Sequence, residues 1–221
     1  MVAASKLTGQ GLNASGVNSE VHHCGISRYK GKAISVSANA TNAYVHDNYI
    51  HDCLPGAGNA VMVGQATSDT NKQVRARVVN NRCVNLAAGT SETLSFKSSG
   101  NTFSGNKLIN CNNITNRHGE RNQILGNRLE RSQGIVIQDA YTLVANNVLA
   151  SIRKGPGIQV MAGSSAWNAQ KQGDHPQAAY TVLRGNTGPL WIGRRYSGYT
   201  YPALGTRVES HKGSIKRGFE G

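Results

Sequence analysis

The sequence of 221 residues contains no long apolar run and no segment with the apolar stripe of an amphipathic helix. No run approaches the roughly 20 apolar residues of a membrane-spanning helix, so we expect no membrane span. The N-terminal residues 1–6 lack the apolar core of a signal peptide, so the protein either stays inside the cell or carries an export signal that has been removed. No stretch resembles an interdomain linker. These absences point away from helical folds and towards one domain built from strands.

Acidic and aromatic residues are also scarce. The chain has 11 Asp and Glu against 24 Lys and Arg, which gives a net charge of +13, and only 6% of its residues are aromatic. Such a charge attracts polyanions, namely nucleic acid, acidic lipid or acidic polysaccharide, or simply keeps the protein soluble. The basic residues are scattered singly, and no helix-turn-helix, zinc finger or aromatic stacking motif occurs. We therefore expect an acidic polysaccharide as the partner, and no nucleic acid.

What the sequence does contain is a repeat. An asparagine followed by a short apolar segment recurs at intervals of 33, 25, 21, 20 and 39 residues, at Asn48, Asn81, Asn106, Asn127, Asn147 and Asn186. Short runs of alternating apolar residues lie before the first of these asparagines, at 33–36, and between later ones, at 60–63, 93–96, 133–137 and 157–160. Alternation with period two, rich in Val and Ile and bounded by Gly, Asn and Ser, is typical of strands.

Strands without helices, repeating about every 20–25 residues, predict an all-β right-handed parallel β-helix, a solenoid of roughly seven or eight coils. An antiparallel sandwich or propeller is the alternative, but the tight hairpin dipeptides that it needs are scarce. Asparagine tolerates left-handed backbone and can hydrogen-bond to its equivalents in neighbouring coils. We predict one domain over residues 1–221, with a loop insertion at about 162–179 and an irregular C-terminal segment at about 196–221.

The four cysteines are spaced 29, 30 and 28 residues apart, close to one in each early coil. Cys53 and Cys111 each follow a repeat asparagine by five residues, so they occupy the same place in different coils. This spacing predicts a stack of small buried core residues. The absence of a Cys-x-x-Cys pair argues against a zinc site, whereas the even count permits a disulfide.

The strand alternation also predicts which side chains point outward. Leu94 and Phe96 pointing inward place Lys97 outward, and the same reasoning places Arg117 and Gln138 outward in the next two coils. These three residues would form one external column with a step of about 4.8 Å. At that separation Arg117 would disfavour the charged form of Lys97, and a neutral lysine is a competent general base. Alternatively, the two side chains splay apart in solvent.

Residues 91–99 read Ser-Glu-Thr-Leu-Ser-Phe-Lys-Ser-Ser, and they are followed by Asn-Thr-Phe at 101–103, Asn-Arg-His-Gly at 116–119 and Gly-Asn at 126–127. This series resembles the signature of polysaccharide lyase family 6, which contains chondroitinase B and alginate lyases. The similarity is densest over 88–128 and extends more loosely from about 40 to 195. The resemblance implies β-elimination on a uronic-acid polysaccharide, with alginate favoured over dermatan or chondroitin, inside a parallel β-helix.

In that family a lysine removes the C5 proton of the uronate and an arginine assists departure of the glycosidic oxygen. The resemblance assigns these catalytic roles to Lys97 and Arg117. Arginine holds its proton too tightly to be a good acid. We therefore expect Arg117 to act mainly as an electrostatic stabiliser, and His118 to contact the substrate or relay a proton.

Family members commonly neutralise the uronate with Ca²⁺ held by an asparagine and a Glu-x-Glu pair. Asn59 matches the asparagine and Glu92 the second glutamate, but Thr90 stands at the first position. Loss of one carboxylate lowers both the charge and the number of oxygen ligands, so we expect an incomplete calcium site with weak or no affinity. Protein cations would then neutralise the substrate.

Further residues are candidates for sugar binding. Trp167 and His175 lie in the predicted loop, while Arg194, Tyr196 and Tyr199 lie one coil later; aromatic rings stack on pyranoses and cations meet carboxylates. The alternative for each is ordinary loop or end packing. The second function compatible with the sequence is a non-catalytic β-helix that binds acidic glycans, such as an adhesin or tailspike-like module, or an inactive lyase relative.

The chain is shorter than typical members of the family, so it is either a minimal natural version or a fragment. Uncapped solenoid ends expose strand edges and apolar core, which predicts a homodimer. A polysaccharide substrate favours a secreted or periplasmic location, with the signal peptide already removed.

Overall fold

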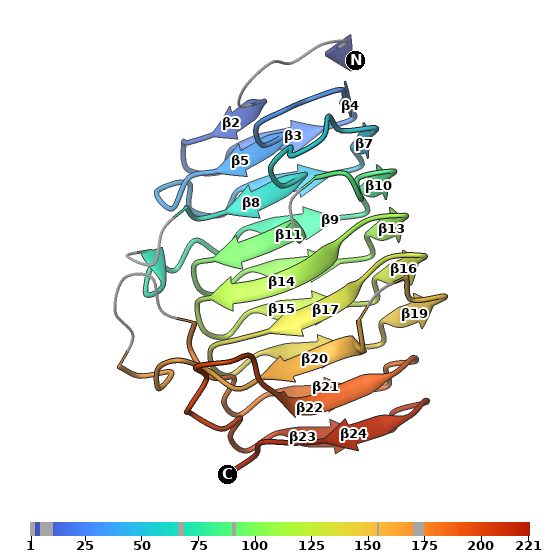
Figure 1. Cartoon of the computed structure of the whole chain (residues 1–221). Coiled ribbons are helices and arrows are strands. Elements are labelled where there is room, and N and C mark those ends of the chain that lie inside the picture. The colour runs from blue at the N-terminus through green and yellow to red at the C-terminus, as the bar shows by residue number, and fades with distance from the viewer. Residues whose placement is uncertain (1–2, 5–10, 66–68, 90–91, 154, 170–174) are drawn as a thin grey trace.

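The computed structural model describes residues 3–4, 11–65, 69–89, 92–153, 155–169 and 175–221. Within these residues the chain winds into a parallel β-solenoid of about 8 turns, with three parallel sheets and no helix (Figure 1). The prediction of an all-β parallel β-helix is therefore confirmed. The described part of the chain contains no helix of a length and hydropathy suited to spanning a membrane.

Successive turns of the solenoid contribute strands to the three sheets, and the strands of consecutive turns pair in parallel. The nine-stranded sheet consists of β2 (Leu12–Ala14), β5 (Ile34–Val36), β8 (Val61–Val63), β11 (Glu92–Lys97), β14 (Asn113–His118), β17 (Gly134–Ile137), β20 (Gly157–Met161), β22 (Leu190–Arg194) and β24 (Ile215–Arg217).

The other two sheets have shorter strands. The eight-stranded sheet consists of β3 (Glu20–His22), β6 (Tyr44–His46), β9 (Arg77–Val79), β12 (Thr102–Ser104), β15 (Gln123–Leu125), β18 (Leu143–Ala145), β21 (Val182–Arg184) and β23 (Arg207–Glu209). The seven-stranded sheet consists of β1 (Ala3–Ala4), β4 (Gly25–Ser27), β7 (Tyr49–His51), β10 (Arg82–Val84), β13 (Lys107–Ile109), β16 (Arg128–Glu130) and β19 (Val148–Ala150).

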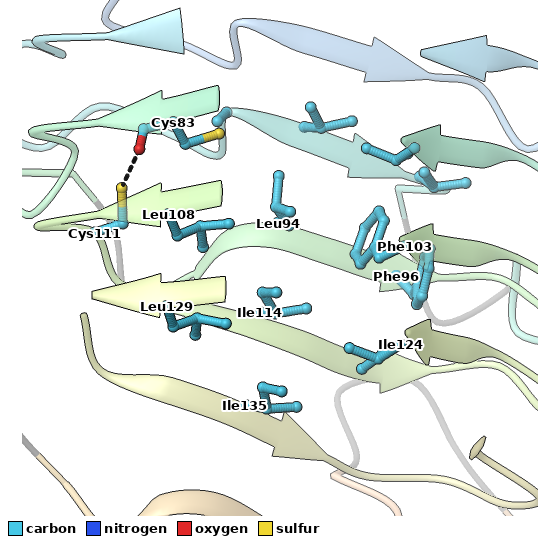
Figure 2. Close-up of a cluster of buried hydrophobic side chains, with 14 of the residues drawn as sticks. Cys83, Leu94, Phe96, Phe103, Leu108, Cys111, Ile114, Ile124, Leu129 and Ile135 are labelled. Atoms are coloured by element: carbon cyan, nitrogen blue, oxygen red, sulfur yellow. Dashed lines mark hydrogen bonds between the residues drawn. The ribbon is translucent and has the colours of Figure 1, made fainter. Parts of the chain in front are cut away.

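The core is a stack of apolar side chains of similar size from successive coils (Figure 2). Leu94, Ile114 and Ile135 are laterally paired and fully buried. The rings of Phe96 and Phe103 stack with centroids 3.6 Å apart. Because each coil is narrow, most of its inward side chains contact the coils above and below, which joins the turns into one cooperative unit.

The prediction that the cysteines are buried is confirmed for two of them, although Cys83 lies opposite Ile50 and Leu108 and not opposite another cysteine. Cys83 and Cys111 are fully buried, and the Cys111 thiol lies 3.4 Å from the Cys83 carbonyl oxygen (Figure 2). Burial raises the pKa of the Cys111 thiol to about 12. Cys24 and Cys53 are only half-buried, and all four thiols are free.

The repeat asparagines form a buried ladder, as predicted. The side-chain oxygen of Asn127 accepts hydrogen bonds from the backbone N and the Nδ2 of Asn106, at 2.9 and 3.0 Å. Asn127 in turn donates to Asn147, and the same arrangement continues to Asn186. The left-handed backbone belongs to other asparagines at the corners, including Asn80 and Asn146 with φ of 55° and 57°. The two predicted roles of asparagine, hydrogen bonding between coils and left-handed backbone, are thus divided between neighbouring positions.

The C-terminal segment at 196–221, predicted to be irregular, contains two short strands. β23 and β24 extend the eight- and nine-stranded sheets by one more coil. These strands are only three residues long, and all three side chains of β24 are exposed, so neither produces the buried alternation by which strands were recognised. The predicted loop at 162–179 leaves the nine-stranded sheet at the end of β20 (Figure 1). It rejoins the solenoid through hydrogen bonds at Ala178 and Ala179.

Candidate active site

The two predicted catalytic strands, β11 and β14, are neighbours in the nine-stranded sheet. Phe96 lies opposite Asn116, as the alternation predicts, but Lys97 lies opposite His118. A β-bulge therefore leaves Arg117 as an extra residue between two paired positions. The prediction that Arg117 lies directly beside Lys97 in one column is therefore wrong, because His118 occupies the paired position. Strict alternation cannot foresee an inserted residue.

The segment from Asn116 to Gly119 forms the end of β14 and the residue after it, and its first and last residues have structural roles. Asn116 points inward, and its Nδ2 donates to the Gln138 carbonyl oxygen at 2.9 Å and to Thr142 Oγ1 at 2.7 Å. Gly119 has a φ of 99°, and a Cβ there would lie 2.0 Å from the Ser98 carbonyl oxygen. The first and last residues of the motif are thus structural, which leaves Arg117 and His118 as its functional candidates.

Arg117 forms an ion pair along the outer face of the sheet. Its Nη1 lies 2.7 Å from Glu92 Oε1, and the second carboxylate oxygen of Glu92 accepts a hydrogen bond of 2.8 Å from Ser95 Oγ. The Glu92 side chain is 11% exposed and that of Arg117 is 33% exposed, so the pair is only partly open to water. Much of the positive charge of Arg117 is therefore balanced within the protein.

This pairing bears on the predicted calcium site. Both carboxylate oxygens of Glu92 are engaged by hydrogen-bond donors, one of them cationic. Asn59 Nδ2 donates to the backbone oxygen of Glu92 at 2.8 Å, and Thr90 lies outside the described residues. A hard cation needs several free oxygen ligands, and a guanidinium beside the only matching carboxylate opposes it. The described residues therefore do not fit Ca²⁺; they also contain no group of three His, Cys, Asp or Glu side chains suited to a metal.

The cation that influences Lys97 comes from an earlier coil. Burial first, and then the positive charge of Lys97, lower the pKa of Lys32. Lys32 Nζ lies 3.4 Å from Gln65 Oε1, and Gln65 Nε2 donates to Ser35 Oγ at 2.9 Å. Lys32 is thus close enough to Lys97 for their charges to interact, although the predicted column did not include it. Sequence reasoning missed Lys32 because it precedes its strand and falls outside the alternation.

A polar and aromatic chain connects Arg117 to the next coils. Arg117 Nη2 lies 3.4 Å from His175 Nε2, and the His175 ring stacks on Tyr199 with centroids 5.8 Å apart. Tyr199 hydrogen-bonds to Gln138, and burial raises the pKa of its phenol. A chain of contacts through Tyr199 and His175 thus connects the predicted substrate residue Gln138 to Arg117. Its own side chain is 4% exposed.

The predicted sugar-binding residues separate into two groups. The Arg194 guanidinium lies 5.0 Å from the ring of Tyr196, which meets Tyr199 edge-on at 5.5 Å. Arg194 also hydrogen-bonds to Gln159. Trp167, in contrast, packs edge-on against two other tyrosines, Tyr141 and Tyr180, at 5.4 and 6.0 Å. The structure brings Arg194 and Tyr196 to the Arg117 surface and places Trp167 in a separate aromatic cluster.

The parallel solenoid can be compared with the folds of known proteins. No protein-family model matches the sequence, and no curated protein matches it. Among solved structures, the solenoid is similar to three PL6 alginate lyases, and it therefore has the fold of these enzymes.

The first is a mannuronic-acid-specific polysaccharide family 6 lyase from human gut microbiota, with a TM-score of 0.81 and 19% identity, covering 95% of this chain and 52% of that one. The second is alginate lyase AlyF-OU02 in complex with G6, with a TM-score of 0.69 and 16% identity, covering 96% of this chain and 60% of that one. The third is a PL6 alginate lyase in complex with a trisaccharide, with a TM-score of 0.64 and 16% identity, covering 95% and 59%. The chain thus spans little more than half the length of these lyases.

Proposed function

We propose that the protein is a polysaccharide lyase that cleaves a uronic-acid polysaccharide, with alginate as the favoured substrate, by β-elimination. The observation that carries the proposal is the bulge between β11 and β14. It places Lys97 opposite His118 with Arg117 between the paired positions, on a solenoid with the fold of PL6 alginate lyases. A secreted or periplasmic location follows from such a substrate.

Lys97 acts as the general base in this proposal. Its neutral amine takes the C5 proton of a uronate residue, the C4–O glycosidic bond breaks, and a C4=C5 double bond forms in the new non-reducing end. Water or His118 delivers a proton to the departing oxygen. Only an unprotonated amine can take the proton, so the proposed reaction requires Lys97 to meet the substrate as the neutral amine.

Charge stabilisation is the larger requirement of the reaction. Removing a proton next to a carboxylate creates additional negative charge, so cations must meet that carboxylate in the transition state. We assign this role to Arg117 together with Lys32, without a metal. Because Glu92 already balances Arg117, the substrate carboxylate must compete with Glu92 for the guanidinium.

That same ion pair favours the second candidate function, a non-catalytic β-helix that binds acidic glycans. If Glu92 retained Arg117 in the complex, the stabilising charge would be missing and only binding would remain. Binding would then depend on the remaining cations and aromatic rings of this surface, such as the half-buried Arg194 and the exposed Tyr196.

The ultraviolet absorbance of the unsaturated product separates the two functions. Polymannuronate, polyguluronate and dermatan sulfate are each incubated with the protein, and polymer binding is measured in parallel. A rise in absorbance with at least one polymer supports the lyase. Binding of a polymer without any rise would refute the lyase and favour the glycan-binding protein.

A further inference from the structure

A shallow cleft lies on the opposite side of one solenoid corner from Lys97. It is lined by Asn18, Glu20, Asn42, Tyr44, Arg75 and Arg77, from the first three turns of the eight-stranded sheet and the corner that precedes them. Glu20, Tyr44 and Arg77 are laterally paired on β3, β6 and β9. Asn18, Asn42 and Arg75 are the corner residues of the same turns, with φ of 56°, 61° and 55°.

The two arginines of the cleft form no ion pair with the described residues, although Arg77 is near enough to Glu20 for its charge to act on that carboxylate. Neither Arg75 nor Arg77 has a carboxylate within ion-pairing distance among the residues that the structure describes. Glu20, the one acid of the cleft, is instead hydrogen-bonded to His46 Nε2 at 2.7 Å. Both arginines line the same cleft, so an anion bound there would interact favourably with both.

One of these arginines is held in place before any ligand binds. The Arg77 guanidinium lies 4.2 Å from the centre of the Tyr44 ring, and that ring stacks on His46 at 4.0 Å. His46 is fixed in turn because its second nitrogen hydrogen-bonds to Asp47 at 2.7 Å. A donor held in one orientation loses less side-chain entropy on binding, which favours a specific ligand over a diffuse ion cloud.

The position of Arg75 connects the cleft to the candidate active site. Gly100 has no side chain, and a Cβ there would lie 3.5 Å from Arg75 Cγ. Gly100 follows Lys97 by three residues, so Arg75 lies where the chain leaves β11 and turns the corner. A polymer that passes Lys97 and continues around this corner reaches the two arginines. The amides of Asn18 and Asn42, 3.3 Å apart, provide donors and acceptors for sugar hydroxyls beside them.

We propose that this cleft is a second, non-catalytic binding site for a carboxylate-bearing sugar residue of the same polymer. The polymer class rests on the proposed function; the cleft itself does not. A second site on one chain raises the affinity for long polymers far more than for short ones, because the second contact is intramolecular. The guanidiniums suit carboxylates, which accept two parallel hydrogen bonds from each.

The test uses the full chain with Lys97→Ala, so that no polymer is cut. One variant adds R75Q and R77Q. The matched control adds R82Q and R131Q, because Arg82 lies over the ring of Tyr49 at 5.8 Å as Arg77 does over Tyr44, and Arg131 is a corner residue with a φ of 46° as Arg75 is. Both variants lose two positive charges. Thermal melts establish that both are folded.

Binding of long polymannuronate and polyguluronate is then measured by titration calorimetry at physiological salt. We expect the Kd of the R75Q and R77Q variant to rise at least about tenfold for the long polymer, and that of the control to stay within about twofold. Equal losses in both variants would mean diffuse attraction and would overturn the proposal, as would no loss in either. A tenfold loss for DNA that matches the loss for the polymer would overturn the assignment to a sugar acid.

The two proposals fail in different ways. Product formation is measured separately on the protein with Lys97 intact. If no product forms but the R75Q and R77Q variant selectively loses binding, the lyase proposal is refuted and the proposal of a second binding site stands. If product forms and binding by that variant is unchanged, the proposal of a second binding site is refuted and the lyase proposal stands.

Discussion

The ion pair between Glu92 and Arg117 gives the sharpest prediction about catalysis. Replacing Glu92 with Gln keeps the shape of the side chain and removes its charge. Opposite charges about 4 Å apart at an effective dielectric of 20 attract by about 4 kcal/mol. Desolvation and the ordering of two side chains offset most of this, and the exposure of Arg117 adds screening, which leaves a net effect of about 1–2 kcal/mol.

The substrate carboxylate can pair with Arg117 only if the ion pair with Glu92 breaks, so the net free energy of that pair opposes substrate binding. With Glu92→Gln we therefore expect the KM for the polymer to fall about tenfold, since 1.4 kcal/mol corresponds to a factor of ten. Loss of the pair should also lower the free energy of unfolding by about 1 kcal/mol. Initial rates of product absorbance over a range of polymer concentrations give KM, and urea unfolding gives the stability.

A matched control separates this effect from a change of net charge. Glu130→Gln removes the same charge from an acid that pairs with Arg128 on the seven-stranded sheet, and its kinetics should not change. A tenfold lower kcat/KM for Glu92→Gln, with activity that depends on added calcium in the unmodified protein, would refute the reasoning. Glu92 would then act as a metal ligand, and its pairing with Arg117 would not describe the working enzyme.

The remaining predictions concern stability. Gly119→Ala places a Cβ against a backbone carbonyl of the neighbouring coil and should lower the free energy of unfolding by about 3 kcal/mol or more. Gly56 also has a positive φ, but a Cβ there would meet nothing within 4 Å, so Gly56→Ala should cost about 1 kcal/mol. Urea unfolding compares the two variants. Asn127→Ala leaves buried partners above and below without hydrogen bonds and should cost about 2–4 kcal/mol, whereas the exposed Gln123→Ala should stay within about 0.5 kcal/mol in the same assay. Desolvation lowers the pKa of His46, but its hydrogen bonds to two carboxylates outweigh this and raise it overall, so its contribution to stability is present below the unfolded-state pKa and is lost as pH rises through the folded-state pKa. The unfolding free energy of the unmodified protein should therefore fall more steeply with rising pH than that of His46→Gln, and parallel curves would contradict the assignment.

The architecture was predictable because it repeats. Alternation around Leu94 and Ile114 indicated strands, and the asparagine spacing gave the coil length, since every turn must satisfy the same packing. The ladder at Asn106, Asn127 and Asn147 followed from the same periodicity. What the repeat could not predict was the last coil, where β24 is exposed and has no buried alternation to detect.

The candidate site was less predictable because it depends on exceptions to the repeat. One inserted residue at the bulge moved His118, rather than Arg117, opposite Lys97. The partners of the site come from distant coils: Lys32 from before β5, and His175 from the loop after β20. His175 was a candidate because it lies in the predicted loop, but its contact with Arg117 was not predictable, and Lys32 carried no signal; long side chains reach across several strands by routes that alternation does not define.

The central claim is that Lys97 is the base of a β-elimination. Its most direct test compares the product absorbance of the unmodified protein and of Lys97→Ala on polymannuronate and polyguluronate, with circular dichroism to establish that both proteins retain the β-solenoid. The account predicts unsaturated product from the unmodified protein on at least one polymer and none from Lys97→Ala. Product formation by a folded Lys97→Ala variant at the unmodified rate would contradict it.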